Sequence, residues 1–416
     1  MRTHDVIVVG AGPAGAAVAA RLHQHGVKDV LVLDRYTFPR DKPCGGGLTG
    51  HADEAFAALD LALRVPFVPS TVAHVRCGSF DREVTLGRPV NVIRREDFDA
   101  DLVAQVRARG VEIVEGEGVE ALRPDAGGVT IKTTARERRA KIVIGADGAA
   151  SIVRKHLIGD RAMPHRLFMR ELARPASAPK TDAMLYDFTP MARGVRGYLW
   201  VFPVAGDRVN VGIMHYPAFR RGGPALLDVL RARLGELGYE LPARGNKGWP
   251  VWGYHPRARV SSDRLLTVGD AAGIDGLTGE GIAVAMEQAQ IAGDHAARAL
   301  ARGDFGFRSY RRDLRRAVVG RELALDRWLA RLLYDGSQWR SWLSLVLYDP
   351  QVLAMYAARV DGTSVLADHK LRLWSRLMKH AVAMRSRRRA LDLALPDQPA
   401  LARPREPVLD PQELGR

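Results

Sequence analysis

The chain has 416 residues, of which 47% are hydrophobic and 26% are charged. This composition excludes a fibrous protein and a wholly disordered one, and the length allows one large core or two unequal ones. The two cysteines, Cys44 and Cys77, cannot form a disulfide framework. They fit a reducing compartment, so we expect a cytoplasmic protein.

The net charge of +15 is unevenly distributed. Residues 301–416 hold 22 Lys+Arg against 13 Asp+Glu, a net of +9, which leaves +6 for residues 1–300. Such a basic region could contact an anionic membrane surface, a phosphorylated substrate or nucleic acid, or it could be a solvated helical surface. Composition alone favours the solvated surface.

The sequence predicts no membrane-spanning segment. Arg2 and His4 precede an apolar run and so imitate a secretion signal, but the glycines that follow argue against cleavage. No apolar stretch is long enough to cross a bilayer, so any membrane contact would be peripheral.

The first strand, turn and helix carry the clearest motif. Residues 5–9 predict a strand buried on both faces, which leads into the glycine turn Gly10–Gly15 and an alanine-rich helix. A pyrophosphate can rest on such a turn at a helix N-terminus. Residues 30–33 predict the next parallel strand, which ends in Asp34, where a carboxylate accepts ribose hydroxyls and disfavours a 2′-phosphate. The alternative is a glycine-rich turn in an ordinary βαβ unit, but the strand, helix and acid together favour a dinucleotide.

The next segment is a loop, residues 35–48, with neither helical nor strand periodicity. Its three successive glycines, Gly45 to Gly47, let the backbone approach a large flat group. Further along, the pattern predicts helices over 51–63 and 97–108, and strands over 72–76, 83–86, 111–114, 119–122, 129–133 and 141–144. The last of these strands ends in Gly145–Gly148, an acid between glycines, where α/β sheets keep ligand contacts.

Residues 165–256 are rich in strand residues and aromatics, which predicts a β-rich insertion with an aromatic-lined wall. The nucleotide pattern then returns, because a strand over 264–268 ends in Gly269-Asp270 and a helix follows through 292. From residue 305 the pattern is helical. The last 26 residues hold five prolines and little apolar periodicity, so a disordered tail is expected.

Three stretches carry a family resemblance. Lys42–Gly46 looks like a K-P-C-G-G loop, and Tyr198–Pro203 looks like the end of a P-x-x-Y-x-W-x-F-P motif, with Val195 in place of its first proline. Gly269–Gly273 looks like a shared flavin acid motif. Over about residues 5–295 the chain resembles the FAD-dependent oxidoreductases of the p-hydroxybenzoate hydroxylase structural group and, within it, the geranylgeranyl reductase family.

The resemblance and the spacing of the signals imply an α/β fold. It would consist of a Rossmann-like FAD-binding domain, interrupted by a β-rich substrate domain, and a C-terminal helical region. The expected boundaries are 1–70, 90–165 and 257–300 for the FAD-binding domain, 71–89 and 166–256 for the substrate domain, 301–390 for the helical region and 391–416 for the tail.

The implied cofactor is FAD. The glycine motif and the positions matched to the family give the candidate FAD-binding residues: Gly10, Gly12, Ala14, Gly15, Asp34, Arg35, Cys44, Gly45, Gly47, Arg95, Val119, Asp270, Gly281 and Ile282. Asp270 at a strand end can accept from the ribityl chain, and the amides of Gly281 and Ile282 at a helix N-terminus can bond the isoalloxazine. Arg95 could instead be a solvated or salt-bridged arginine, and Asp147 could cap its own turn.

Cys44 is the candidate catalytic residue. A lone cysteine is more often a small buried hydrophobe, but a loop with three glycines and a lysine is unsuited to core packing. The resemblance places Cys44 near the flavin. An isolated alkene needs a strong proton donor, and a thiol with an unperturbed pKa of about 8.5 is a poor one, so Cys44 could shape the flavin face instead. Cys77 is expected to be an ordinary buried residue.

Tyr198, Trp200 and Phe202 are the candidate substrate-binding residues. Tyr198 and Trp200 alternate with Leu199 and Val201, so in a strand they share one face. They could line an apolar tunnel for a polyprenyl chain, although aromatic stripes in strands are usually core; the resemblance favours the tunnel. No metal-binding motif is present in the sequence, so no metal is expected.

The leading hypothesis is a reductase that saturates carbon–carbon double bonds of an isoprenoid, using reduced FAD. Gly116–Ala121 imitates a second dinucleotide turn, but no apolar helix of the right length follows. The electron donor would therefore be NAD(P)H docking transiently, or a reduced protein carrier. The alternative is a flavin-dependent monooxygenase, a hydroxylase before a halogenase, acting on an apolar or aromatic substrate. Similar halogenases carry W-x-W-x-I-P where this chain has Tyr198–Pro203.

A third hypothesis concerns the basic C-terminal helices. Arg385–Arg389 lies beside Trp374, Leu377, Met378 and Val382, which suggests a basic amphipathic helix at a membrane surface. A helix packed on the FAD-binding domain, with a solvated arginine face, is equally compatible with this sequence. The expected location is cytoplasmic or peripheral on the inner face of the membrane, and no nucleic-acid partner is expected.

Overall fold

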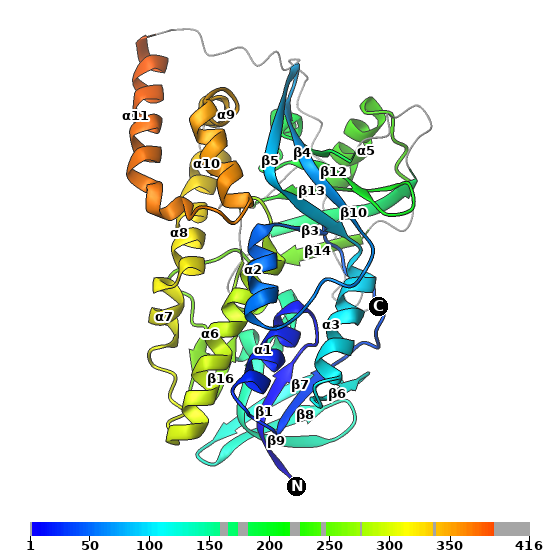
Figure 1. Ribbon diagram of the computed structural model, residues 1–416, viewed down its shortest axis with the longest axis vertical. Coiled ribbons are helices and arrows are strands. Elements are labelled where there is room, and N and C mark those ends of the chain that lie inside the picture. The colour runs from blue at the N-terminus through cyan, green and yellow to red at the C-terminus, as the bar shows by residue number, and fades with distance from the viewer. Residues whose placement is uncertain are drawn as a thin grey trace.

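The computed structural model describes residues 2–158, 165–173, 182–216, 225–242, 247–274, 277–335 and 338–386. Figure 1 shows these residues as two sheets, with helices against both sheets and a group of C-terminal helices at one end. The predicted α/β class with a C-terminal helical region is therefore confirmed. The expected tail, residues 391–416, lies outside the described residues, and the domain boundaries stay predictions.

The first sheet is mainly parallel and forms the lower part of Figure 1. Its strands are β1 (Thr3–Val9), β2 (Val30–Asp34), β6 (Glu112–Glu115), β7 (Val119–Asp125), β8 (Gly128–Thr133), β9 (Glu137–Gly145), β15 (Ser261–Ser262) and β16 (Leu265–Thr267). The order is β15-β16-β9-β1-β2-β6, and β8 joins β7 to β9. The parallel strands β16, β9, β1, β2 and β6 bring their carboxyl ends to one edge, where the glycine turn and the acids follow them.

Both faces of β1 are covered, which explains its continuous apolar sequence. Val6 and Val8 belong to one core with the alanines of α1 (Pro13–Gln24) and α6 (Gly281–Arg302). Ile7 belongs to a second core on the other face, to which α4 (Ile152–Ile158) contributes. Helices α2 (Gly50–Ala58) and α3 (Arg95–Arg107) complete the first core.

The second sheet is antiparallel except where β11 runs parallel to β4. Its order is β14-β10-β13-β12-β11-β4-β5-β3. The strands are β3 (Gly47–Leu48), β4 (Phe67–Cys77), β5 (Phe80–Ile93), β10 (His165–Ala173), β11 (Met184–Asp187), β12 (Leu199–Val204), β13 (Arg208–His215) and β14 (Lys247–Val251). Leu199 and Val201 pack on α5 (Leu226–Glu236), whereas Tyr198, Trp200 and Phe202 belong to the core on the opposite side.

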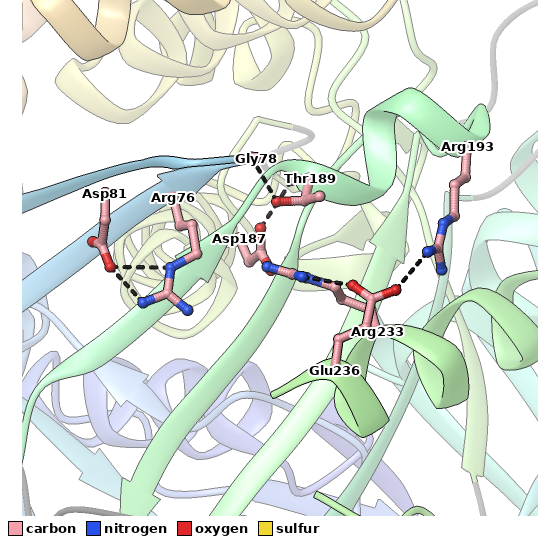
Figure 2. A network of polar contacts seen from close by, with 8 residues as sticks. All are labelled: Arg76, Gly78, Asp81, Asp187, Thr189, Arg193, Arg233 and Glu236. Carbon is pink, nitrogen blue, oxygen red and sulfur yellow. Dashed lines mark hydrogen bonds and ion pairs between the residues drawn. The ribbon is translucent and has the colours of Figure 1, made fainter. Parts of the chain in front are cut away.

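A polar network, drawn in Figure 2, fastens α5 to the second sheet. The buried Asp187 carboxylate accepts from Arg233 Nε at 2.7 Å and from the Thr189 amide at 2.9 Å. Thr189 in turn accepts from the amide of Gly78 in the β4–β5 turn, and Glu236 pairs with Arg233 at 2.6 Å. These contacts serve the fold, because none of these residues lines the cavity that is formed by both sheets and the C-terminal helices.

The C-terminal helices are α7 (Tyr310–Arg316), α8 (Val318–Ala330), α9 (Trp339–Tyr348), α10 (Pro350–Val360) and α11 (Lys370–Ser386). Short helical turns are η1 (Gly148–Ala150), η2 (Thr189–Arg193), η3 (Gly269–Ala271), η4 (Arg331–Asp335) and η5 (Leu366–His369). In Figure 1, α9, α10 and α11 stand together beside the β4–β5 hairpin. Among the described residues, no helix combines the length and the apolar character needed to cross a membrane.

Several element ends differ from their predicted positions. The helix predicted over 51–63 ends at Ala58, because Asp60 adopts a left-handed conformation with φ of 53°. The helix predicted to end at 292 continues to Arg302, where Gly303 at φ 68° terminates it. The strands predicted over 72–76 and 83–86 are parts of the longer β4–β5 hairpin, in which Phe67–Cys77 pairs with Phe80–Ile93.

Candidate functional site

A cavity of about 460 Å³ is lined by residues of both sheets and of the C-terminal helices. The glycine turn after β1, the acid after β2 and the loop around Cys44 contribute one part of its wall. The aromatic residues of β12 contribute another, and α9, α10 and α11 contribute a third. The cavity therefore joins the segments that the sequence singles out separately.

The turn after β1 depends on two glycines. Gly10 has φ of 99°, and a Cβ on it would lie 2.4 Å from the Ala146 carbonyl oxygen. A Cβ on Gly15 would lie 1.8 Å from the Gly10 carbonyl oxygen, so Gly15 lets α1 approach the turn and does not itself line the cavity. Asp34 holds the same turn, because its Oδ2 accepts from the Ala11 amide at 2.7 Å and its Oδ1 from the Tyr36 amide at 2.9 Å.

Two arginines share one buried carboxylate beside this turn. Arg95 donates to both oxygens of Asp99 at 2.7 Å, and Arg40 Nη2 lies 3.2 Å from Asp99 Oδ2. Burial opposes the charge on Arg95, but the Asp99 carboxylate outweighs it and raises the pKa of Arg95. Arg95 is therefore salt-bridged and also lines the cavity. Its position is compatible with both predictions, a salt-bridged arginine and a residue at the cofactor site. Arg40, which no sequence motif marks, brings the charge of the trio Arg40, Arg95 and Asp99 to +1.

Lys42 reaches the acid of the third nucleotide signal. Its Nζ lies 3.8 Å from Asp270 Oδ2 and 4.2 Å from the centre of the Trp249 ring. Burial lowers the pKa of Lys42 to about 8, although the Asp270 charge opposes this change. Lys42 belongs to the motif Lys42–Gly46, so the signal for it was present in the sequence, but it was not among the predicted site residues.

The Cys44 loop is attached to the second sheet through Asn210. Asn210 Nδ2 donates to the Cys44 carbonyl at 2.7 Å, and Asn210 Oδ1 accepts from Trp200 Nε1 at 2.9 Å. A Cβ on Gly45 would lie 3.1 Å from the Phe202 ring, so the glycine permits this close packing. Asn210 was missed because no motif marks it and its partners are distant in sequence.

The aromatic residues of β12 form one wall of the cavity, as their alternation predicts. Phe202 also contacts Tyr186 of β11, with ring centres 5.0 Å apart, and Tyr198 donates a hydrogen bond to the Thr278 carbonyl. The tyrosine hydroxyl thereby fixes the segment just before α6. The wall is continuous from the Cys44 loop to Thr278.

Most other predicted residues also reach the cavity. The predicted cofactor residues that line it, in addition to Gly10, Asp34 and Arg95, are Gly12, Ala14, Arg35, Cys44, Gly45, Gly47, Val119, Asp270, Gly281 and Ile282. Asp147 lines it as well and caps α4 through the Ile152 amide at 2.8 Å, as the alternative interpretation proposed. Residues 116–118 connect β6 to β7, so the expectation that they begin no second dinucleotide unit is confirmed.

The residues at the glycine turn fit FAD. Asp147 Oδ1 and Arg40 Nε are buried without a hydrogen-bond partner among the described residues, and both side chains belong to the cavity lining. A cofactor with hydroxyl groups and a pyrophosphate offers partners of both kinds. The backbone amides at the start of α1 and the surplus positive charge of Arg40 and Arg95 suit the pyrophosphate.

Comparison with known families and proteins agrees with this fit. Residues 3–319 match the FAD binding domain family. Digeranylgeranylglycerophospholipid reductase 1 of Methanopyrus kandleri is 30% identical over 317 residues, covering 72% of this chain and 82% of the relative. Menaquinone reductase of Mycobacterium tuberculosis is 29% identical over 322 residues, covering 70% of this chain and 76% of the relative.

Solved structures share the fold at lower identity. A geranylgeranyl bacteriochlorophyll reductase-like protein of Thermoplasma acidophilum superposes with a TM-score of 0.70 at 21% identity, covering 89% of this chain and 99% of that protein. The halogenase PltM superposes with a TM-score of 0.68 at 18% identity, covering 94% and 88%. The matched family and the relatives show that this chain is an FAD-dependent oxidoreductase and belongs to the geranylgeranyl reductase family.

Proposed function

We propose that this enzyme reduces carbon–carbon double bonds of an isoprenoid chain. The observation that carries the proposal is the continuity of the cavity lining from the glycine turn, past the aromatic wall, to the apolar side chains of the C-terminal helices. The apolar residues at that far end are Leu329, Leu332, Leu345, Leu353, Leu366, Leu373 and Leu377. A long hydrocarbon substrate gains from burial against such a surface, because each buried CH₂ contributes about 0.8 kcal/mol.

Each part of the lining has a distinct task. FAD, when bound and reduced, supplies the hydride equivalent that an alkene needs. The glycine turn with Arg40 and Arg95 would hold its pyrophosphate, Asp34 its ribose, and Asp270 its ribityl chain. The aromatic wall excludes water and orients the substrate double bond, so that little motion remains to be lost when the reaction begins.

The electron donor that we propose is NAD(P)H docking transiently, or a reduced protein carrier. The described residues form one dinucleotide-type turn at the end of a parallel strand, and Gly116–Gly118 do not build another. Two of the relatives carry reductase names, which favours reduction over the alternative oxygen chemistry.

Product mass tests the proposal. The purified enzyme is supplied with dithionite and, separately, geranylgeranyl diphosphate, a digeranylgeranylglycerophospholipid and menaquinone. Products are exposed to air before mass analysis, because dithionite also reduces the quinone ring of menaquinone without enzyme. We then expect a gain of two hydrogens per reduced carbon–carbon bond in at least one of the three. Gain of an oxygen or halogen atom under air, without any hydrogen gain in the anaerobic sample, would favour the monooxygenase or halogenase alternative.

We further propose that α11 brings the enzyme to an anionic membrane surface, from which a prenyl lipid enters. Leu371, Trp374, Met378 and Val382 are 77%, 51%, 46% and 62% exposed and follow each other at helical spacing. Two other residues of α11, Leu373 and Leu377, are buried and line the cavity. The helix thus separates the cavity from an exposed apolar stripe, and the exposed Lys370, Arg372 and Lys379 beside the stripe complement anionic headgroups.

Co-sedimentation with vesicles tests this surface. Phosphatidylcholine vesicles with and without phosphatidylglycerol are compared, using the wild type and the double variant L371E/M378E. We expect the wild type to prefer the anionic vesicles and the variant to lose this binding. F67E, which alters an exposed apolar residue on β4, is the matched control. Equal binding by all three proteins would contradict the proposal.

A further inference from the structure

A buried polar cluster lies behind the start of α6, next to the large cavity. Arg359 of α10 is its centre: Arg359 Nε lies 2.9 Å from Glu322 Oε2, and its Nη2 donates to Asp326 at 2.6 Å. Glu280, the residue before α6, lies 4.0 Å from the same guanidinium. His51 of α2 completes the cluster through Glu287 Oε1, at 3.6 Å from His51 Nδ1.

The cluster encloses a second, much smaller cavity of about 10 Å³. Its polar lining comes from His51, Glu280, Glu287, Glu322 and Arg359. This volume is at the lower limit for one water molecule. His51 Nε2 is buried there without a hydrogen-bond partner in the described part of the chain. One water between His51 and Glu280 would satisfy this nitrogen.

Glu280 connects the small cavity with the large one. Among the described residues it is the residue that lines both. The Thr49 hydroxyl, also at the large cavity, donates to Glu280 Oε1. Burial raises the pKa of Tyr186 in the aromatic wall, and the neighbouring Glu280 carboxyl group raises it further. The Glu280 carboxyl group is therefore close enough to the aromatic wall to influence its electrostatics.

The cluster holds more carboxyl groups than cations. Its carboxyl groups are those of Glu280, Glu287, Glu322 and Asp326, and its cations are His51 and Arg359. The Glu287 carboxylate, 3.6 Å away, raises the pKa of His51 to about 9 against the effect of burial, so the imidazolium is favoured at neutral pH. Fully ionised, the cluster would carry a net charge of −2, and the start of α6 and Arg359 are the positive groups beside the Glu280 carboxyl group.

We propose that Glu280 is the catalytic acid of the alkene reduction and that His51 returns its proton. This inference rests on the proposed function. The alkene gains a hydride equivalent from the reduced cofactor at one carbon and the Glu280 proton at the other, so that two C–H bonds replace the π bond. The Glu280 carboxylate then takes a proton from His51 through the small cavity, and His51 is reprotonated from solvent past the partly exposed Glu287. A carboxylic acid is a far stronger donor than the Cys44 thiol.

Single-turnover kinetics test the acid role. In E280Q the first reduction is expected to be about 100-fold slower or more, with FAD affinity unchanged. In H51Q the first turnover is expected to keep its rate while steady-state turnover slows, because only the return of the proton is lost. E280D keeps a carboxyl group and is expected to recover part of the rate. E236Q, which alters an arginine-paired glutamate on α5, is the matched control.

A second readout does not depend on turnover. Infrared spectroscopy looks for the C=O stretch of a protonated carboxylic acid in the wild type and in E280Q, and we expect a band in the wild type that E280Q lacks. Absence of this band, or an E280Q reduction rate within threefold of wild type, would overturn the acid role while leaving the proposed function intact. A wild type that reduces no isoprenoid double bond would instead overturn the proposed function and this inference with it.

Discussion

Asn210 shows how one side chain can join two parts of the site. It lies on β13 of the second sheet, yet it binds the Cys44 carbonyl in the loop after β2 and the indole of Trp200. The side chain is 3% exposed, so water does not replace either hydrogen bond. The position of the Cys44 loop relative to the aromatic wall depends on this contact.

N210L is therefore expected to destabilise the fold. It leaves a buried indole N–H and a partly buried carbonyl unpaired, which together cost about 2–4 kcal/mol. Urea unfolding measures the loss. A loss below about 0.5 kcal/mol for N210L would show that the contact contributes little.

The ion pair between His51 and Glu287 predicts a pH dependence of stability. Its pKa of about 9 in the folded protein lies above the ordinary 6.5, so the stabilisation is complete below pH 6.5 and is lost as pH rises through about 9. H51Q should therefore lose most stability near pH 6, at most about 3 kcal/mol, and little near pH 10. Urea unfolding of both proteins across this range measures the difference, and a loss independent of pH would contradict the pairing.

Among the elements, the first turn of α1 is the most sensitive. G15A places a methyl group 1.8 Å from the Gly10 carbonyl oxygen, so α1 must move away from the turn that would hold the pyrophosphate. We expect FAD affinity to fall about tenfold or more, with a destabilisation of about 1–3 kcal/mol. Flavin fluorescence and thermal melting measure the two effects.

The control is another glycine inside a helix. Gly235 in α5 has no atom within 4 Å of its Cβ position, so G235A should be neutral or stabilise the helix by up to about 1 kcal/mol. Equal losses in G15A and G235A would mean that close packing at the turn is not the cause.

Elements whose burial follows from the apolar pattern of their own residues could be predicted from the sequence. The apolar run of β1 requires cover on both faces, and the alternation in β12 places Tyr198, Trp200 and Phe202 on one side. Helix ends were less predictable, because Asp60 and Gly303 end helices through backbone conformation rather than polarity. Residues that act through distant partners, such as Arg40 and Asn210, leave no periodic signal in the sequence.

At the scale of the whole molecule, the site is assembled from segments far apart in the sequence. The Cys44 loop, β12, the segment before α6 and the C-terminal helices all line one cavity. The sequence predicts an apolar face on each helix after residue 305, but not which surface that face covers. Leu373 and Leu377 therefore could not be assigned to the cavity, and the link between Glu280 and His51 required the packing of α2 against α6.

In the proposed function, this cavity places an isoprenoid double bond where FAD can reduce it. The most direct measurement is anaerobic: the flavin-loaded enzyme is reduced with dithionite, geranylgeranyl diphosphate is added, and flavin reoxidation is followed together with product mass. We expect reoxidation without oxygen, coupled to a gain of two hydrogens per double bond. Flavin that stays reduced until air is admitted, with no reduced product, would contradict it.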